Sequence, residues 1–502
     1  MTVMRKLLRR IVILVPAVIL QLVWLRLLFT WLSPWAGVIS FALSNLSLLV
    51  VLYITIRLGE STYKVLWLLV VLTFPLPGTA LYLCFGNKRT GKVLEKKLSA
   101  AKLPAPTENG CREALASQRL RLAQTVGYLE NMTGASLCRS GEIRYFHLGE
   151  QMLPAMLAAM EGAAQSIYLE YFIIEPGLMW NSMTEIMARK AAQGVDVRVI
   201  YDDLGSISTF SKSDAKALEA RGIRCLPFNP LIFVKGTLNY RDHRKMLIVD
   251  GTTVFSGGIN LADEYINQKE KYGHWKDIGF RLSGSGAESY TAMFLQFWNS
   301  FSDSPISSDE YQYHKPRPMN GDGYVLSYYD SPLRDTAASN ELYVELLSQA
   351  RRYAYFYTPY LMLGDALLDA FVRAARRGVD VRLILPGIPD KKLIYRISRS
   401  YYPVLLDAGV KIYEYEPGFV HAKACIVDDI AGTIGTVNLD YRSLFLHFEN
   451  NSLFIQSPVL QDLKADFLNT QTLCRERTTE NITMNFGRWL LDGILRIFAP
   501  LC

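Results

Sequence analysis

The sequence has few of the residues that build disulfide frameworks and metal sites. It contains 7 cysteines and 6 histidines in 502 residues. The cysteines are scattered, form no CxxC pair and have no histidine partner at zinc spacing. An odd, dispersed set of thiols is typical of a reducing, cytosolic setting rather than of a disulfide-stapled secreted fold. We therefore expect neither a disulfide scaffold nor a structural zinc site.

Charge is also scarce, and it is nearly absent near the N-terminus. Charged residues make up 20% of the chain and hydrophobic residues 50%. Between residues 11 and 31 the only charge is Arg26, and residues 36–56 carry none. A bilayer crossing needs roughly 20 apolar residues. The sequence thus predicts two membrane spans, and the second one argues against a cleaved signal peptide.

A third apolar stretch, residues 65–85, contains Pro75-Leu76-Pro77-Gly78 and should be broken or kinked there. It fits a bent span, a re-entrant segment or an interfacial hairpin. Basic residues flank the whole region, at 5–10 and at 88–97, which places both ends in the cytoplasm by the positive-inside rule. The formal net charge of +7 also suits an anionic partner, either lipid or nucleic acid.

The rest of the chain reads as two copies of one α/β unit. The segment AQGVDVRVI at 192–200 matches RRGVDVRLI at 376–384, and each follows a helical pattern. Strand-like runs precede these helices at 166–174 and 353–360. The order strand, helix, strand predicts βαβ units with a largely parallel sheet. Matched segments at nearly constant separation indicate an internal duplication.

These patterns divide the chain into six predicted parts. Residues 1–88 form a membrane anchor, 89–130 a linker and 131–302 a first α/β domain. Residues 303–322 form a second linker, 323–478 a second α/β domain and 479–502 an amphipathic C-terminal segment. Apolar residues recur at roughly helical spacing in that last segment. It either lies on a membrane surface or packs against the preceding domain.

The residues suited to catalysis occupy matching places in the two copies. The first copy reads HRKMLIVD at 243–250 and the second HAKACIVD at 421–428. Small residues and an asparagine follow each, as GGIN at 257–260 and GTVN at 435–438. Residues two apart on a strand point to the same face, so each histidine projects together with the lysine that follows it. The pairs are His243 with Lys245 and His421 with Lys423.

An imidazole beside an ammonium group is suited to phosphate chemistry. The lysine neutralises a phosphate oxygen, while the imidazole attacks phosphorus or transfers a proton. The amides of Asn260 and Asn438 can donate to another phosphate oxygen. A single HxK pattern is weak evidence, but its recurrence within a repeat is strong. The other four histidines, His147, His274, His314 and His447, lack such neighbours and are expected to be structural or surface residues.

These paired HxKx4D motifs resemble the phospholipase D superfamily, and their surroundings resemble the cardiolipin synthase family. The matching segments are NYRD at 239–242, DEY at 263–265, WKD at 275–277 and NLDYRS at 438–443. One departure is His447, where many members carry Asn before the Phe-Glu pair. The resemblance implies two duplicated phospholipase D-like α-β-α sandwich domains with a shared active site, preceded by N-terminal transmembrane helices.

The resemblance further implies a metal-free displacement through a phosphohistidine, without any cofactor. His243 is assigned as nucleophile and His421 as acid and base, with Lys245 and Lys423 stabilising phosphate charge. Carboxylates should orient the imidazoles by accepting a ring N–H.

For that orienting role we assign Glu449 to His421 and Asp277 to His243. Asp250 and Asp428 complete the motifs and are expected to hold their geometry. Glu170 is a further candidate for the wall of the site.

The implied reaction joins two phosphatidylglycerol molecules into cardiolipin and releases glycerol at the bacterial cytoplasmic membrane. The partners are then these membrane lipids, with no nucleic acid, and the sequence does not specify an oligomeric state. A hydrolase using water as acceptor and a phosphatidylserine synthase are alternatives with the same residues. The predicted spans argue against a nuclease of the same superfamily, and the intact HxK motifs argue against a non-catalytic scaffold.

Overall fold

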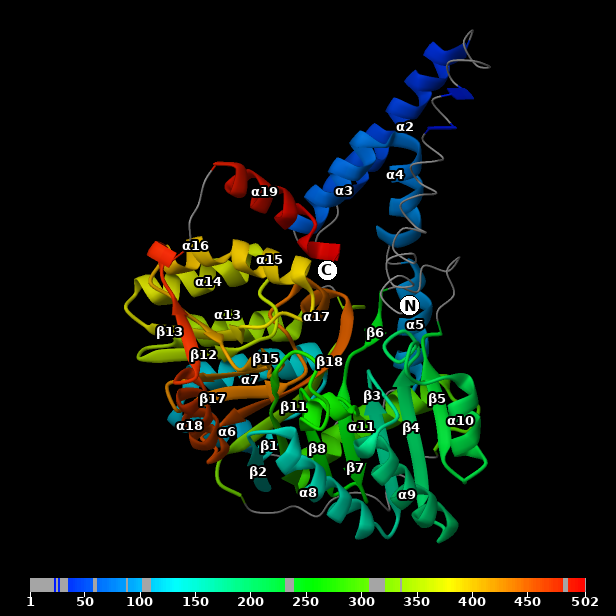
Figure 1. Ribbon diagram of the computed structural model, residues 1–502, viewed down its shortest axis with the longest axis vertical. Helices are drawn as coiled ribbons and strands as arrows, with labels where there is room; N and C mark the ends of the chain where they lie inside the picture. Colours follow the sequence, from blue (N-terminus) through cyan, green and yellow to red (C-terminus); the bar gives the residue numbers. More distant parts are fainter. Residues whose placement is uncertain are drawn as a thin grey trace. The chain divides into compact units, whose positions relative to one another are not determined.

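The computed structural model describes residues 22–23, 26–27, 35–56, 61–86, 89–101, 110–230, 239–306, 321–334, 336–481 and 486–501. The chain forms two compact units (Figure 1). The first comprises residues 1–90 with 234–236, and the second comprises residues 91–233 with 237–502. His314, one of the histidines set aside above, lies outside the described residues.

The first unit is helical, with α2 (Ala36–Ile56), α3 (Ser61–Thr73), α4 (Pro75–Leu81) and a π-helical turn η2 (Tyr82–Gly86). The predicted break occurs at Phe74, and Pro75 then begins α4, where its missing N–H costs nothing. A Cβ on Gly78 would lie 2.3 Å from the Val70 carbonyl oxygen. Only glycine therefore allows α4 to pack this closely against α3.

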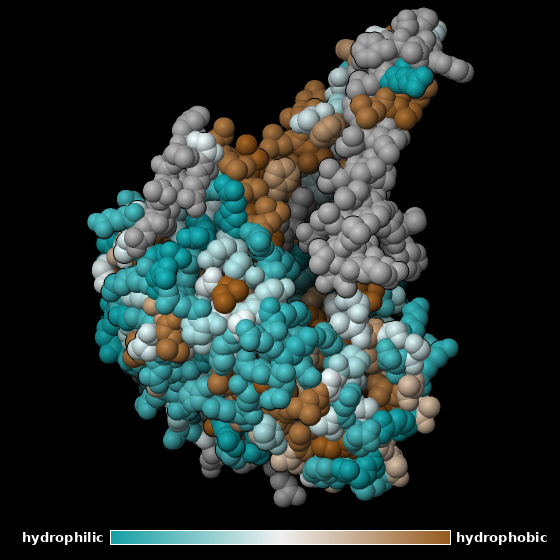
Figure 2. All heavy atoms as spheres, in the orientation of Figure 1, coloured by the Kyte–Doolittle hydropathy of each residue, from teal (hydrophilic) through white to brown (hydrophobic). Residues whose placement is uncertain are grey.

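The helix α2 covers the second predicted span, and its exposed apolar side chains, with those of α3, form much of the brown surface of this unit in Figure 2. The first predicted span lies almost wholly outside the described residues. Within the described ranges, no helix combines the length and apolar character that a membrane crossing requires. The predicted transmembrane helices are not confirmed.

The second unit contains two α/β halves. The first half consists of β2 (Glu142–Phe146), α8 (Gly149–Glu161), β3 (Ser166–Tyr171), α9 (Leu178–Ala192), β4 (Asp196–Asp202), α10 (Lys212–Glu219), β5 (Arg224–Phe228), β6 (Arg241–Asp242), β7 (Lys245–Val249), β8 (Thr253–Gly257), η4 (Asp263–Ile266), β9 (His274–Lys276), β10 (Gly279–Ser283) and α11 (Ser285–Phe301).

The second half follows a similar order, with one additional helix in its middle and further elements at its end. It consists of β11 (Tyr324–Asp330), α13 (Ala338–Gln349), β12 (Tyr353–Tyr357), α14 (Asp365–Arg376), β13 (Asp380–Pro386), α15 (Lys392–Ser400), α16 (Tyr402–Asp407), β14 (Lys411–Tyr415), β15 (Gly418–Val420), β16 (Ala424–Val427), β17 (Ala431–Gly435), α17 (Tyr441–Phe445), β18 (His447–Ile455), α18 (Val459–Gln471), β19 (Cys474–Arg477), η5 (Thr479–Asn481), α19 (Phe486–Ile497) and η6 (Ala499–Leu501).

The two main sheets have the same strand order, which confirms the duplication. The first runs β2-β10-β8-β7-β3-β4-β5, and the second contains the equivalent path β11-β18-β17-β16-β12-β13-β14. Along these two paths of described strands, the parallel pairs are confined to β3-β4-β5 and β12-β13-β14, and the other neighbours are antiparallel. The prediction of largely parallel sheets was therefore wrong. The HxK strands β7 and β16 continue into hairpins, and hairpins produce antiparallel pairs.

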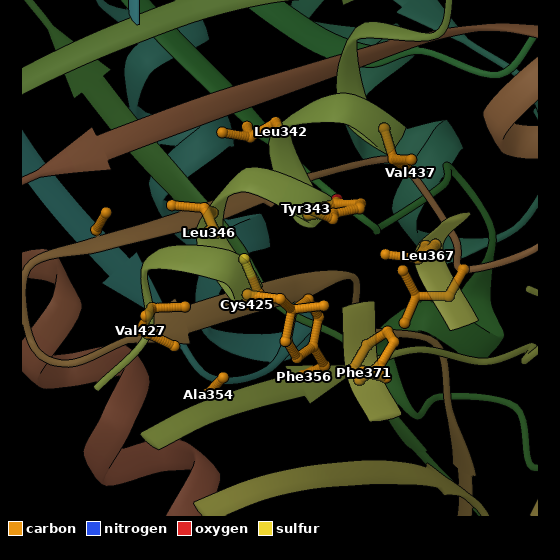
Figure 3. Close-up of a cluster of buried hydrophobic side chains, with 14 of the residues drawn as sticks. Leu342, Tyr343, Leu346, Ala354, Phe356, Leu367, Phe371, Cys425, Val427 and Val437 are labelled. Atoms are coloured by element: carbon orange, nitrogen blue, oxygen red, sulfur yellow. The ribbon is translucent and has the colours of Figure 1, made fainter. Parts of the chain in front are cut away.

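Three apolar clusters divide the second unit into layers. One lies between the sheet of the first half and α8, α9 and α10. Another lies between the second sheet and its helices, and Figure 3 shows Cys425 of β16 beside Phe356 and Val427 beside Ala354 in it. The third contains residues from both sheets together with α11 and α18. In Figure 1, α9 and α10 flank β4 and β5, and α13 and α14 flank β12 and β13. The described layers are those of two α/β sandwiches with a shared central core.

The segment predicted as the first linker is instead structured. It forms α5 (Arg89–Ala100), α6 (Cys111–Gln118) and most of α7 (Leu120–Thr133). Leu115, Leu122 and Val126 enter the core of the second half, and the short strand β1 (Cys138–Arg139) pairs with β11 of the second sheet. The predicted boundary at residue 131 is therefore wrong, because buried apolar residues tie this segment to a distant part of the chain. Residues 307–320, in the second predicted linker, lie outside the described residues.

The C-terminal helix α19 packs against α15 on one side. Arg496 donates to the hydroxyl and the carbonyl oxygen of Ser400, and Leu495 contacts the core of the second half. On the other side, four large apolar side chains are exposed, namely Leu490, Leu491, Ile494 and Phe498. The predicted packing against the core is therefore present, and an apolar surface remains beside it. Within the described part of the chain, no disulfide is formed by Cys111, Cys138, Cys225, Cys425 or Cys474.

Candidate active site

Each motif histidine is held in place by the other half of the chain. His243 follows β6, which pairs in parallel with β18, and its backbone N–H donates to Phe448 O at 2.9 Å. His421 follows β15, which pairs in parallel with β9, and its N–H donates to Lys276 O at 2.7 Å. These two reciprocal strand pairs bring both HxK motifs to the boundary between the halves.

The same exchange pairs each imidazole with a carboxylate from the opposite half. Nδ1 of His243 lies 2.8 Å from Oε2 of Glu449, and Nδ1 of His421 lies 2.6 Å from Oδ2 of Asp277. Both predicted carboxylates thus contact a motif histidine, but the predicted pairing was the reverse of this one. The sequence assignment kept each carboxylate with a histidine of its own half, whereas the strand exchange crosses the halves.

The carboxylate of Glu449 is itself fixed by hydroxyl donors. Ser443 Oγ donates to it at 2.7 Å and Thr436 Oγ1 at 2.5 Å. Asp277 accepts the backbone N–H of Ile278 at 2.8 Å. Carboxylates held in this way fix the orientation of the imidazoles that they contact.

Burial sets the charge state of the two histidines. Each is only 7% exposed. Desolvation lowers the pKa of His421 to about 4, and it lowers the pKa of His243 well below its ordinary value, with Lys245, His447, Lys423 and His421 adding to the effect. Both rings are therefore neutral at neutral pH. Because Nδ1 donates to a carboxylate, the remaining lone pair is on Nε2, which is the reactive atom.

The two lysines lie among the same groups. Nζ of Lys245 donates to His243 O at 2.7 Å, and Nζ of Lys423 donates to His421 O. Burial lowers the pKa of Lys245 to about 8 and that of Lys423 to about 7, while Glu449 and Asp277 raise both pKa values in part. Each lysine thus interacts with both carboxylates. Two lysine amines, two carboxyl groups and two neutral imidazoles converge on one site.

The two motif asparagines are buried near the histidines and bound to protein groups. Nδ2 of Asn260 donates to Tyr265 OH at 2.7 Å, and Nδ2 of Asn438 donates to Asp440 Oδ2 at 2.9 Å. An amide nitrogen carries two hydrogens, and one hydrogen bond uses one of them. The predicted phosphate contact of these asparagines stays a prediction.

The two motif aspartates, Asp250 and Asp428, accept hydrogen bonds from the backbone of a neighbouring strand. The carboxylate of Asp250 accepts the backbone N–H groups of residues 164, 165 and 166, at the start of β3. Asp428 accepts those of residues 351, 352 and 353, at the start of β12. Both aspartates have positive φ angles, 51° and 56°. Each one ties the turn after the HxK strand to the neighbouring strand, as expected for a residue that holds the motif geometry.

Glu170 belongs to a buried ion pair rather than to the lining of the site. Its side chain is fully buried and forms an ion pair with Arg244, which also bonds Asp242 Oδ1 at 2.9 Å. The guanidinium of Arg244 lies 3.4 Å from the ring centroid of Phe297 in α11. This buried network supports the segment that carries His243. The prediction that Glu170 lines the site is corrected accordingly.

Aromatic neighbours and one further histidine were missed by the sequence analysis. Phe172 packs edge-to-face on His243 with ring centroids 5.0 Å apart, and Tyr265 packs on His421 at 5.2 Å. His447, expected to be structural or on the surface, is 8% exposed with its ring 5.6 Å from that of His243. Its position next to the Phe448-Glu449 pair is the only sequence signal that could have located it.

Comparison of this chain with known proteins agrees with the duplicated halves and with the two HxK motifs. A family model described as "Cardiolipin synthase, PLD-like domain" matches residues 156–274 and 343–470, and one described as "Phospholipase_D-nuclease N-terminal" matches residues 46–87. An uncharacterized protein of Streptococcus mutans is 40% identical over 90% of this chain and 99% of its own. A cardiolipin synthase of a Geobacillus species is 32% identical over 87% of this chain and 88% of its own.

Among solved structures, the phosphatidylserine synthase of Haemophilus influenzae is similar with a TM-score of 0.55. It covers 75% of this chain and 97% of its own, at 16% identity, and so shows a shared fold. The matched ranges of the cardiolipin synthase model contain both HxK motifs. With its duplicated α/β halves and its reciprocal histidine–carboxylate pairs, the chain belongs to the cardiolipin synthase family of the phospholipase D superfamily.

Proposed function

We propose that the protein is a cardiolipin synthase, which transfers the phosphatidyl group of one phosphatidylglycerol to the terminal glycerol hydroxyl of a second. The products are cardiolipin and glycerol. The observation that carries this proposal is the convergence of two imidazole–lysine pairs, one from each half, with a carboxylate from the opposite half on each imidazole. The family relationship supports the choice of lipid substrates.

In the first step, Nε2 of His243 attacks the phosphorus of the donor lipid, forming a P–N bond and breaking the P–O bond to glycerol. His421 donates the proton that the leaving glycerol oxygen takes up. The free enzyme holds His421 neutral, with a pKa lowered to about 4 by burial. A bound phosphodiester anion raises the pKa of His421, so the ring takes up a proton from solvent when substrate binds and passes this proton to the leaving oxygen.

In the second step, neutral His421 removes a proton from the acceptor hydroxyl as that oxygen attacks phosphorus. The P–N bond breaks, His243 is regenerated and cardiolipin leaves. The ammonium groups of Lys245 and Lys423 stabilise charge on the non-bridging oxygens in both steps, together with Asn260 and Asn438. Glu449 orients His243 and balances the charge of its phosphorylated ring, and Asp277 does the same for protonated His421.

We also propose that the chain acts at a membrane, with the N-terminal segment as anchor and the catalytic halves on the cytoplasmic side. Both substrates are lipids. The exposed apolar residues of α2 and α3 in the first unit, and of α19 in the second, support contact with a bilayer. Flotation of the full-length protein with phosphatidylglycerol vesicles tests this, and full recovery in the soluble fraction would contradict it.

The function is tested with full-length protein, phosphatidylglycerol vesicles and a chelator in place of any added metal. We expect equimolar cardiolipin and glycerol. The variants His243→Ala and His421→Ala should each abolish the transfer, while His147→Ala, which removes a half-exposed histidine paired with Asp466, should retain it. Phosphatidic acid as the sole product would identify a hydrolase. DNA cleavage without any lipid product would identify a nuclease.

A further inference from the structure

His447 lies beside the proposed nucleophile. Its side chain is 8% exposed, and neither Nδ1 nor Nε2 has a hydrogen-bond partner among the described residues. Buried polar atoms are nearly always hydrogen-bonded, and an exception points to a ligand, a water molecule or an ion. His447 has no role in the proposed mechanism, and that mechanism therefore does not account for its buried position.

The groups around His447 form a compact ligand set. Its Nδ1 lies 3.9 Å from Oε1 of Glu449, and its ring centroid lies 5.6 Å from that of His243. One ligand atom from each of His243, His447 and Glu449 lies within 4.8 Å of the other two, and all three residues are buried. The ring of Phe172 packs against both imidazoles, with centroids at 5.0 Å from His243 and 6.3 Å from His447.

Two imidazoles and one carboxylate are a ligand set that suits zinc and its neighbours in the first transition row. Such three-ligand sites leave a further coordination position open. Magnesium and calcium prefer oxygen ligands and are not suited to it. Arg442, Arg241, Lys245 and Lys391 place positive charge near His447 and oppose a metal ion, while the carboxylates of Glu449 and Asp277 lie among the same groups and act in its favour.

We propose that His243, His447 and Glu449 bind a divalent transition-metal ion such as Zn²⁺, and that the bound ion inhibits the enzyme. The binding follows from the ligand set alone, and the inhibition rests on the proposed function. The ion coordinates Nδ1 of His243, the nitrogen that otherwise donates to Glu449. The ring proton then resides on Nε2. His243 therefore has no lone pair for phosphorus while the metal is bound.

Binding is measured without reference to activity. Co²⁺ is titrated into the full-length, chelator-treated protein in a zwitterionic detergent, and the visible absorption of imidazole-ligated cobalt is followed. We expect saturation at one equivalent, no competition by Mg²⁺ and displacement by Zn²⁺. His447→Asn should weaken the affinity by at least about tenfold, the scale on which changes around a metal site act. His147→Asn, which removes a histidine outside the cluster, should leave it unchanged.

Thermal unfolding gives a second readout and controls for misfolding. Zn²⁺ should raise the unfolding midpoint of the wild type and of His147→Asn, since a ligand that binds the folded state stabilises it. It should not do so for His447→Asn or for His447→Gln. An unchanged cobalt spectrum and affinity in both His447 variants would overturn the site.

The inhibition is tested separately with phosphatidylglycerol vesicles. Zn²⁺ should inhibit the wild type over the concentration range that fills the site, and His447→Asn should need at least about tenfold more. Full activity at metal saturation would overturn the inhibition while leaving the site in place. A protein that binds one cobalt yet never forms a lipid product would count against the proposed function and not against the metal site.

Discussion

His243 and Glu449 are 206 positions apart in the chain, yet Nδ1 of the histidine lies 2.8 Å from a carboxylate oxygen of the glutamate. His421 and Asp277, 144 positions apart, form the matching contact at 2.6 Å in the opposite direction along the chain. Each motif histidine therefore takes its carboxylate from the other half of the duplicated unit. The active site depends on both halves being folded and joined.

This cross-pairing can be tested with double-mutant cycles on the free energy of unfolding. We expect a coupling of about 0.5–3 kcal/mol between His243 and Glu449, and between His421 and Asp277, the range found for residues in direct contact. The couplings of His243 with Asp277 and of His421 with Glu449 should be clearly smaller. Denaturant unfolding of the single and double variants to Ala or Gln measures all four. Larger couplings in the second pair of cycles would contradict the structure.

The orienting carboxylates should affect turnover more than substrate binding. Glu449→Gln and Asp277→Asn keep the side-chain size but remove the negative charge that stabilises a charged imidazole. We expect kcat to fall about 100-fold or more, as for loss of acid–base assistance, with KM changing much less. Steady-state assays with phosphatidylglycerol in mixed micelles give both constants. A rise in KM at constant kcat would indicate that these residues bind substrate instead.

The buried lysines predict a loss of substrate affinity as the pH rises. Burial lowers the pKa of Lys245 to about 8 and that of Lys423 to about 7, so the free enzyme loses these two positive charges across that range. The bound phosphodiester anion favours the charged lysines and raises their pKa. We therefore expect KM to increase from pH 7 to pH 9 while kcat changes little. A KM that is constant across this range would contradict the lowered pKa values.

Asp250 should contribute to stability through its three backbone hydrogen bonds. Asp250→Ala removes both acceptor oxygens, and with them all three hydrogen bonds, and it places an alanine at a φ of 51°. Hydrogen bonds to charged groups are worth about 1.5–3 kcal/mol each. Asp250→Asn keeps the Oδ1 acceptor used by residues 165 and 166 and tolerates positive φ. The unfolding free energy should thus fall more for Ala than for Asn. Equal losses in chemical denaturation would argue against this role.

Gly258 should be intolerant of any side chain. A Cβ at this position would lie 2.1 Å from Oδ1 of Asp277, whose other oxygen holds His421. Gly258→Ala should displace that carboxylate and reduce kcat to a similar degree as Asp277→Asn. Gly162→Ala is the matched control, because its added Cβ would meet no atom closer than 3.5 Å. Similar activity of the two alanine variants would show that Asp277 can move without loss.

The repeated motifs allowed much of the site to be predicted from sequence. His243, Lys245, His421 and Lys423 were identified because a strand places alternate residues on one face, and because the same spacing recurs in both copies. The supporting role of Asp250 and Asp428 followed from their place at the end of each strand. These are local relationships, and local sequence spacing is sufficient to determine them.

Other predictions failed where the answer depends on contacts between distant segments. The carboxylates were assigned to the wrong histidines because β6 pairs with β18 and β15 with β9, which exchanges partners between the halves. Glu170 was expected at the site and instead meets Arg244 in a buried ion pair.

His447 was set aside because it has no motif around it, yet strand pairing brings it beside His243. The sequence by itself thus determined which side chains perform the chemistry and that there are two sets of them. Only the tertiary structure decided which partners they meet, because strand pairing between remote segments leaves no local pattern in the chain.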